Sequence, residues 1–154
     1  MQKEVIAVAL NYERITTPEM LEDAIGVRFT VFVDEQKVPA DEERDEYDDT
    51  PESCHHFLVT DNGKAIGAGR WKEYEPGVAK MQRIAVLLPY RGTGVGRQLL
   101  ATMEADAKAE GYSASFLGAQ CTAEGFYHKL GYETEPGEPF LDAGIPHVNM
   151  RKQL

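Results

Sequence analysis

A glycine-bearing loop flanked by two arginines carries the strongest chemical signal in the sequence. Residues 90–97 read Tyr-Arg-Gly-Thr-Gly-Val-Gly-Arg and join a predicted strand to a predicted helix. At such a junction, unpaired backbone N–H groups and the helix dipole form an anion site, and glycines let the backbone approach a phosphate closely. Arg97 stands where a dinucleotide-binding motif needs its third glycine, and the Gly-Lys-Ser/Thr ending of a Walker motif is absent. We therefore expect a phosphate-binding loop that belongs to neither of these two classes.

The chain is strongly acidic, and much of this charge lies in one segment. Its 154 residues include 16 Lys and Arg against 26 Asp and Glu, which gives a formal charge of −10. This balance argues against a nucleic-acid partner, because phosphate-backbone binding needs a basic face. Seven of the nine residues at 41–49 are acidic, which predicts an exposed loop. Such a loop favours a cationic acceptor among the candidate substrates.

Length and composition predict one globular domain over residues 1–154. The chain is 42% apolar and has no repeat or linker that would divide it. The longest early apolar run, residues 5–10, is too short to span a membrane and lacks the features of a secretory leader. We therefore expect a cytoplasmic protein without a membrane partner. Its oligomeric state is left open, with a homodimer as one option.

The elements that must position the loop alternate between strands and helices. Thr17 and Pro18 predict the start of a first helix, and Gly111 and Gly131 predict the ends of two later ones, the second of which covers residues 121–130. Asn62-Gly63 predicts a tight hairpin turn. The predicted strands are residues 5–10, ended by Asn11, then 56–60, 65–71, 78–87, a segment at 116–117, 132–134 and 147–150. This β-α-β-β-β-α-β-α-β-β order predicts an α+β fold with a mixed, mostly antiparallel sheet flanked by helices.

Two motifs in the second half carry a resemblance to a known superfamily. Residues 91–96 fit the pattern Gln/Arg-x-x-Gly-x-Gly/Ala. Gln120, Phe126-Tyr127 and Gly131-Tyr132 keep the spacing of a second motif, with Gln in place of the usual Asn. By these motifs the chain resembles the GNAT superfamily of acyl-CoA-dependent N-acyltransferases.

Two further segments are similar to a small bacterial subgroup of this superfamily. One contains Val31-Phe32, Glu35-Gln36 and Val38-Pro39 and is followed by the acidic segment. The other is Ala143-Gly144-Ile145-Pro146-His147. The resemblance covers nearly the whole chain and implies an enzyme that transfers an acetyl group from acetyl-CoA to a primary amine. The acceptor would be a small molecule or a peptide, and its amine would attack directly in a ternary complex.

The resemblance also implies roles for individual residues. Tyr127 matches the tyrosine that lies near the CoA sulfur and acts as a general acid. A backbone N–H near Val86 or Leu87 would face the thioester carbonyl. The residues expected to hold acetyl-CoA are the backbone of Ile84, Ala85 and Val86, the loop residues Arg91, Gly92, Thr93, Gly94, Val95, Gly96 and Arg97, and Gln120.

The sequence does not identify the base that deprotonates the amine. An alkylammonium has a pKa near 10.4, so it must lose its proton before it attacks at neutral pH. Relatives in the subgroup often carry Glu on the strand before the cofactor loop, whereas this chain has Gln82, which cannot accept a proton at neutral pH. The candidates are water and the side chains of Glu35, Asp45, Asp48, His55, His56 and His147.

Two alternative functions remain at this stage. The first half also resembles autoinducer synthases, which share the fold and take their amine from S-adenosylmethionine; the matching residues are Arg28, Val31-Phe32, Asp45 with Asp48, and Arg70. The intact loop at residues 91–96 weighs against this alternative, because it points to CoA itself. The second alternative is a non-catalytic acyl-CoA sensor, which Gln82 keeps open.

The two cysteines are predicted to be reduced thiols without a catalytic or metal-binding role. Cys121 lies near the expected cofactor but has no adjacent His-Asp arrangement to activate it, which favours a small buried hydrophobic residue. Cys54 precedes His55-His56, but neighbouring strand residues point to opposite faces and no fourth ligand is evident. We therefore expect no metal site.

Overall fold

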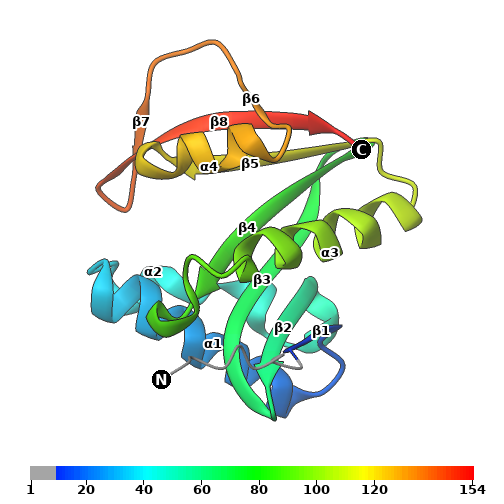
Figure 1. The fold of residues 1–154 in the computed structure, drawn as a ribbon, viewed down its shortest axis with the longest axis vertical. Coiled ribbons are helices and arrows are strands. Elements are labelled where there is room, and N and C mark those ends of the chain that lie inside the picture. Colours follow the sequence, from blue (N-terminus) through cyan, green and yellow to red (C-terminus); the bar gives the residue numbers. More distant parts are fainter. Residues whose placement is uncertain (1–9) are drawn as a thin grey trace, which may run out of the picture.

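A computed structural model describes residues 10–154 of the chain (Figure 1). Its centre is a sheet with the strand order β1-β2-β3-β4-β5-β8-β6, and β7 pairs with β8. Within the described part, the β4–β5 ladder is parallel and the other ladders are antiparallel. Helices pack on this sheet, so the predicted fold class of a mixed, mostly antiparallel sheet flanked by helices is confirmed.

The first strand that the structure describes continues past Asn11, where the sequence predicts that it ends. Strand β1 (Leu10–Arg14) pairs antiparallel with β2 (His55–Asp61). The prediction that Asn11 ends the strand is wrong, because an edge strand can turn polar side chains such as that of Asn11 to solvent. Residues 5–9 of the predicted strand lie outside the described residues.

The first helix begins as the sequence predicts and then changes its winding. In α1 (Pro18–Arg28), the Thr17 hydroxyl accepts the Met20 N–H at 3.2 Å, and Pro18 occupies the first turn. The helix continues directly into a π-helical segment, Phe29–Glu35. Such wider turns often mark functional sites. Here the segment brings Phe32 and, just after it, Gln36 to the cleft described below.

The meander of β2, β3 (Lys64–Glu75) and β4 (Val78–Val86) forms as predicted. Asn62 and Gly63 have φ angles of 51° and 85°, which confirms the tight turn between β2 and β3. Strand β4 contains one extra residue opposite Gly69, and Arg83 at this bulge has a φ of 56°. The bulge re-aims the side chains that follow it along β4.

The two halves of the sheet meet only over a short parallel ladder. Residues Val78, Ala79 and Lys80 of β4 pair with the first three residues of β5 (Ala114–Gln120). Beyond Lys80 the two strands diverge, as Figure 1 shows by the opening between β4 and β5. The facing backbone groups of both strands are therefore left without a sheet partner at this opening.

Helices cover both faces of the meander. Helix α3 (Val95–Ala109) packs Leu99 and Met103 on the face that carries Met81, and α1 packs Leu21 and Ile25 on the face that carries Ala68 and Ala85. This α3 contact fixes the loop at residues 90–97 beside the end of β4. The phosphate-binding loop predicted from the sequence thus lies at the opening between the strands.

The last part of the chain contains a strand that the sequence did not predict. After a 3-10 turn at Cys121–Ala123 come α4 (Glu124–Lys129), β6 (Glu133–Thr134), β7 (Phe140–Asp142) and β8 (Ile145–Gln153). Strand β7 forms a hairpin with β8 through Ala143 and Gly144, whose φ angles are 53° and 78°. Alanine rarely adopts this conformation, so Ala-Gly gave no turn signal comparable with Asn-Gly.

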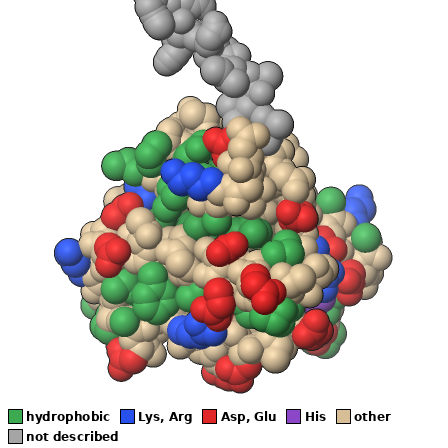
Figure 2. Space-filling model, turned by 90° about the horizontal axis from the view of Figure 1, so that it is seen from below, with side chains coloured by type: hydrophobic (Ala, Val, Ile, Leu, Met, Phe, Trp, Pro, Cys, Tyr) green, Lys and Arg blue, Asp and Glu red, His purple; other side chains and the backbone are tan. Residues whose placement is uncertain are grey.

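The acidic segment is not an exposed loop, which corrects the prediction for residues 41–49. It folds as α2 (Ala40–Glu43) and a 3-10 turn at Glu46–Asp48, followed by a second turn at Pro51–Ser53. Glu43 and Asp48 are only 3% and 0% exposed. Buried arginines pair with these carboxylates, as described below. Other acidic side chains stay at the surface, and acidic groups outnumber basic ones on the face in Figure 2.

Candidate active site

A cleft with a volume of about 650 Å³ opens where β4 and β5 diverge. The glycine-bearing loop and α4 border one part of it. The π-helical segment, α2 and the β7–β8 hairpin border another part. The cleft therefore brings together segments from both halves of the sequence, including most of the residues that the sequence singled out.

The loop before α3 combines exposed backbone amides with two arginines. Gly92 and Gly94 have φ angles of 78° and 91°, and Gly94 is the N-cap of α3 without any side-chain cap. The first N–H groups of α3 thus have no intrahelical acceptor. Arg91, Gly92, Gly94, Gly96 and Arg97 all line the cleft. This arrangement can bind an anion such as a pyrophosphate.

Two predicted loop residues shape the loop from outside the cleft lining. The Thr93 hydroxyl donates to the Tyr90 carbonyl at 2.5 Å, and Val95 is buried with a 2% exposed side chain. Their side chains therefore support the loop rather than face the cleft. The Val95 amide still belongs to the first turn of α3, and the Thr93 amide lies in the turn that precedes the N-cap Gly94.

Arg91 is held in place by partners on either side. Its Nε donates to the Val86 carbonyl at 2.8 Å, and a terminal nitrogen pairs with Glu35 Oε1 at 2.7 Å. Glu35 was a candidate base, but this ion pair ties its carboxylate to the anion-binding loop. It is therefore poorly placed to take a proton from an amine in the cleft.

The free edge of β4 supplies one of the two amides expected to face a thioester. The Leu87 N–H donates to the Ile66 carbonyl at 2.9 Å, so it is occupied within the sheet. Gly67 pairs with Val86, and in an antiparallel ladder the hydrogen-bonding direction alternates from one residue to the next. The Val86 N–H therefore points away from β3 into the opening. Of the two backbone N–H groups that the sequence offered to a thioester carbonyl, that of Leu87 is thus excluded, and that of Val86 remains.

Tyr127 lines the cleft from α4. Its ring is half-buried and packs edge-to-face against Phe126 and Tyr132, with centroid distances of 5.0 and 5.9 Å. Burial raises the pKa of the Tyr127 hydroxyl to about 12. The hydroxyl therefore keeps its proton at neutral pH and can donate it.

Gln120 closes the cleft at the end of β5. Its Nε2 donates to Gln36 Oε1 at 2.8 Å, which joins β5 to the residue that follows the π-helical segment. Both glutamines line the cleft. The contact bridges two segments that lie 84 residues apart in the sequence.

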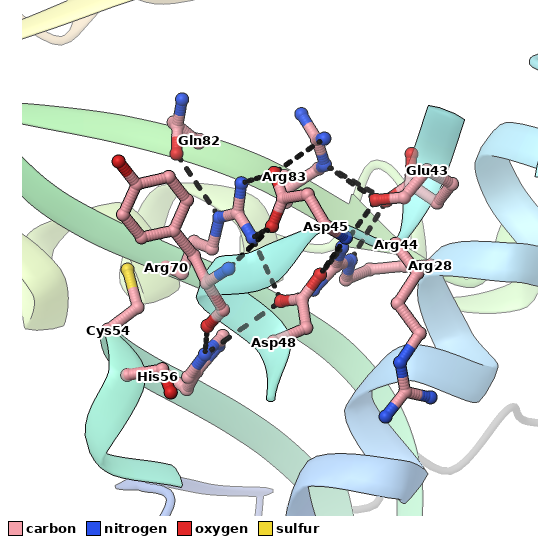
Figure 3. A network of polar contacts seen from close by, with 12 residues as sticks. Arg28, Glu43, Arg44, Asp45, Asp48, Cys54, His56, Arg70, Gln82 and Arg83 are labelled. Carbon is pink, nitrogen blue, oxygen red and sulfur yellow. Dashed lines mark hydrogen bonds and ion pairs between the residues drawn. The ribbon is translucent and has the colours of Figure 1, made fainter. Parts of the chain in front are cut away.

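Buried arginines and carboxylates form a network beside the cleft (Figure 3). Arg28 donates to both Asp48 oxygens at 2.8 and 2.9 Å and to Glu43 at 2.9 Å. Arg70 binds both Asp45 oxygens at 2.8 and 2.7 Å and reaches Asp48 at 2.8 Å. Arg83, at the β4 bulge, pairs with Glu43 at 3.2 Å. We call these six residues the Arg-carboxylate network.

Three candidates for the base lie in this network or against it. Burial alone would raise the pKa of Asp48, but the hydrogen bonds and charges of Arg28 and Arg70 outweigh it and hold this pKa far below its usual range. The pKa of Asp45 is also lowered, because Arg70 outweighs the effect of burial. His56 contacts the Tyr47 carbonyl at 2.8 Å, and burial lowers its pKa. None of these three side chains is among the described residues that line the cleft.

The two remaining histidines differ in position. His55 stacks on Trp71 with a centroid distance of 3.7 Å and does not line the cleft. His147 lines the cleft and is 8% exposed. Its Nδ1 lies 2.6 Å from the Ile145 carbonyl, which can only accept, so Nδ1 bears the proton in the neutral ring. Nε2 then has a lone pair and can accept a proton.

The cysteines take part in packing. The Cys54 thiol is buried and donates to the Trp71 carbonyl at 3.1 Å, and partly buried Cys121 packs against the main core. Across residues 10–154, no cluster of three or more His, Cys, Asp or Glu side chains could hold a metal ion.

Comparison with known proteins decides the family. The acetyltransferase (GNAT) domain matches residues 16–154. The chain belongs to the GNAT acetyltransferase family. This membership supports a transferase activity and, as for the family, acyl-CoA as the cosubstrate.

Relatives of this GNAT protein cover almost the whole chain. The uncharacterized N-acetyltransferase YjcF of Bacillus subtilis is 46% identical over 134 residues, which make up 87% of this chain and 93% of YjcF. A solved structure from Lactobacillus plantarum, whose description proposes an N-acetyltransferase, is 31% identical with a TM-score of 0.86 and covers 95% of this chain and 99% of its own. An acyl-CoA N-acyltransferase structure from Pseudomonas aeruginosa is 25% identical with a TM-score of 0.80 and covers 95% and 99% of the two chains.

None of the helices that the structure describes in residues 10–154 has the length and apolar character needed to cross a membrane. The cleft of this GNAT protein lies where β4 and β5 separate within the sheet.

Sequence reasoning singled out Gln82 but missed Lys80, Glu43 and Arg83 among the polar residues of the cleft in this GNAT protein. Alternation along β4 could have placed Lys80 and Gln82 on one face, because neither residue suits an apolar core. Glu43 and Arg83 gave no signal, since the bulge and the fold of α2 decide their positions. Burial raises the pKa of Glu43, although Arg83 and Arg28 act against this change.

Proposed function

We propose that this protein transfers an acetyl group from acetyl-CoA to a primary amine of a small molecule or peptide by direct attack in a ternary complex. The observation that carries this proposal is the opening between β4 and β5 beside an amide-rich loop at the start of α3. The free strand edge suits a pantetheine arm, and the loop suits a pyrophosphate. Family membership supports both assignments. We also propose that the enzyme works in the cytoplasm.

Acetyl-CoA would bind along the free edge of β4 and over the loop. The segment Ile84, Ala85 and Val86 would bind the pantetheine arm as an added strand does, through the backbone groups of Ile84 and Val86 that face the opening. The amides of residues 91–97 and the guanidinium of Arg91 would hold the pyrophosphate. Arg91 pairs with Glu35, so phosphate would compete with this carboxylate for the guanidinium. Gln120 would close the site at the end of β5.

The chemistry would use groups on both sides of the thioester. The amine nitrogen attacks the carbonyl carbon, and the Val86 N–H stabilises the negative charge that develops on the oxygen. The C–S bond breaks, and Tyr127 donates its proton to the thiolate. Among the candidates for the base, His147 has the supporting geometry: its Nε2 would take the proton of the amine, directly or through water.

The test is release of the CoA thiol from acetyl-CoA in the presence of amines, amino acids, polyamines and peptides. We expect turnover with a subset of these acceptors. Tight CoA binding without turnover for any acceptor would contradict the transferase and support a sensor.

One observation favours a second candidate, an autoinducer-synthase-like acyltransferase. The four charged residues that match that branch, Arg28, Asp45, Asp48 and Arg70, contact one another in the Arg-carboxylate network. Thiol release that requires both S-adenosylmethionine and acyl-carrier protein would favour this candidate. Release from acetyl-CoA with other amines would exclude it.

A further inference from the structure

A lysine without a carboxylate partner lies in the wall of the cleft. Lys80 lines the cleft at the point where β4 and β5 separate, and it is half-buried. Within residues 10–154 it forms no ion pair within 4.0 Å, in contrast to Arg28, Arg70 and Arg83. Its Nζ lies over the rings of Tyr74 and Phe116, at 5.6 and 5.9 Å from their centroids. The aromatic rings thus hold the ammonium but do not neutralise it.

The surroundings of Lys80 make the charged form of its side chain unfavourable. Burial is the main influence that lowers the pKa of Lys80, and the nearby cations Lys72, Arg83 and Arg70 lower it further. Asp142 of β7 is the acid that counteracts them, but it lies too far away to form an ion pair. An anionic ligand group in the cleft would relieve this imbalance.

Gln82 provides a second donor on the same face of β4. Residues two apart on a strand share a face, and the residue between them, Met81, packs in the core against α3. Gln82 Oε1 accepts from Arg70 Nε at 3.1 Å, which leaves the amide nitrogen free to donate. Figure 3 shows this nitrogen pointing away from Arg70. A carboxylate at position 82 would have supplied Lys80 with an acid, whereas the neutral amide does not.

The proposed base faces the same side of the sheet. Lys80 pairs with Phe116 of β5, and four residues further along β5, Gln120 pairs with His147 of β8. An even number of residues along a strand keeps the same face. An acceptor bound on this side could therefore meet both the cation and the base.

We propose that the acceptor carries a carboxylate in addition to its primary amine, and that Lys80 and Gln82 bind this carboxylate. The substrate class is therefore amino acids or related amino-carboxylates. This inference rests on the proposed function, whose acceptor it specifies. It differs from the expectation of a cationic acceptor, because three carboxylates of the acidic segment are already paired with arginines.

The test compares matched acceptors that differ only in the carboxylate. We would measure kcat/KM for glycine, β-alanine and 4-aminobutyrate against their amides, with spermidine as a polyamine, at saturating acetyl-CoA. We expect the carboxylates to be preferred by at least about tenfold, as a charge-assisted hydrogen bond provides. Equal rates for acids and amides, or a preference for spermidine, would overturn the inference and leave the proposed transferase intact.

Variants then assign the carboxylate to Lys80. Lys80→Met should raise KM for the acids by about tenfold or more and leave KM for acetyl-CoA and for the amides unchanged. Lys80→Arg should retain much of the preference. Lys72→Met is the matched control: Lys72 pairs with Lys80 across β3 and β4 but does not line the cleft, so the preference should persist. An unchanged preference in Lys80→Met would overturn the assignment.

A binding experiment separates this inference from the proposed function. Calorimetric titration of the same amino acids into the CoA-saturated protein measures binding of the carboxylate without turnover. If no acceptor is acetylated but the acids bind to wild type and not to Lys80→Met, the transferase proposal is contradicted and the carboxylate site stands. If the acids bind equally well to both proteins, the site is contradicted.

Discussion

At the scale of single residues, environment rather than residue type selects the chemistry. Tyr127 and His147 both line the cleft, and in the proposed mechanism one would donate a proton and the other would accept one. Burial keeps the Tyr127 proton in place, and the Ile145 carbonyl fixes the tautomer of His147. His55 and His56 have the same side chain as His147, but stacking on Trp71 and contact with the Tyr47 carbonyl keep them out of the cleft.

Removing the Tyr127 hydroxyl should slow the chemical step. We expect Tyr127→Phe to lower kcat by about 10²-fold, the usual contribution of a general acid, with little change in KM for acetyl-CoA. Because the pKa of Tyr127 is raised to about 12, loss of its proton should not limit the rate until the pH approaches that value. Tyr112→Phe, which removes a surface contact with Glu73, is the control. An unchanged kcat where chemistry is rate-limiting would refute the assignment.

The buried carboxylate of Asp48 should contribute far more to the free energy of unfolding than an exposed carboxylate does. Asp48→Asn leaves Arg28 and Arg70 without a full partner, so we expect a loss of about 3–5 kcal/mol in the free energy of unfolding, measured in urea. Glu22→Gln, which breaks the exposed pair with Arg44, should cost less than about 1 kcal/mol. Similar losses for both variants would contradict the role of burial.

The same residue sets a pH dependence of stability. The folded-state pKa of Asp48 lies below its value of 3.8 in the unfolded chain, so the unfolded state takes up its proton first as the pH falls. Its contribution is therefore fully present above the unfolded value and is lost as the pH drops below it. Unfolding midpoints measured between pH 7 and pH 3 should fall more in wild type than in Asp48→Asn.

At the scale of elements, the junction of β4 and α3 would control cofactor binding in the proposed function. The loop between them offers amides from α3, and Arg91 connects it both to the end of β4 and to Glu35 at the end of the π-helical segment. The bulge at Arg83 lies within the free edge of β4 and interrupts the pairing with β3, which resumes at Ala85 and Val86. These features depend on how the elements meet, not on any one of them alone.

Two substitutions with opposite effects probe this junction. Arg91→Ala should raise the Kd for CoA by about tenfold or more, because it removes a charged donor from the loop. Glu35→Gln should lower the Kd, since Arg91 would no longer have to leave a carboxylate. Arg14→Ala, which affects a surface pair with Asp106, should leave the Kd unchanged. Calorimetry measures all three, and unaltered affinity in Arg91→Ala would exclude its role in pyrophosphate binding.

At the scale of the whole molecule, one short parallel ladder joins the two halves of the sheet. It involves three residue pairs of β4 and β5, while CoA would contact both strands beyond it. A ligand that binds only the folded state adds to its stability by mass action. CoA bound at this opening would therefore stabilise the folded protein as a whole.

CoA should accordingly stabilise the protein against heat. At a CoA concentration of about 100 times Kd we expect a gain of about 2.7 kcal/mol, seen as a rise in Tm of several degrees. Arg91→Ala should show a smaller rise at the same concentration. A Tm that does not respond to CoA in wild type would argue against binding at this opening.

The sequence by itself determined the features that depend on local patterns. Thr17-Pro18, Asn62-Gly63 and the loop at residues 90–97 predicted a helix start, a hairpin and an anion site, because caps, turns and helix N-termini are formed by neighbouring residues. The order of the predicted strands and helices then predicted the fold class, and the family motifs predicted a role for Tyr127.

Only the tertiary structure decided which charged residues are free to act. The segment at residues 41–49 is as acidic as any exposed loop, and nothing in its own pattern shows that Arg28 and Arg70, from distant elements, neutralise it. The same holds for Lys80, which forms no ion pair with any of residues 10–154 and whose strand neighbour Gln82 carries no charge. The contribution of a charged side chain to stability or binding depends on its partners and its burial. Both are set by contacts between segments far apart in the chain.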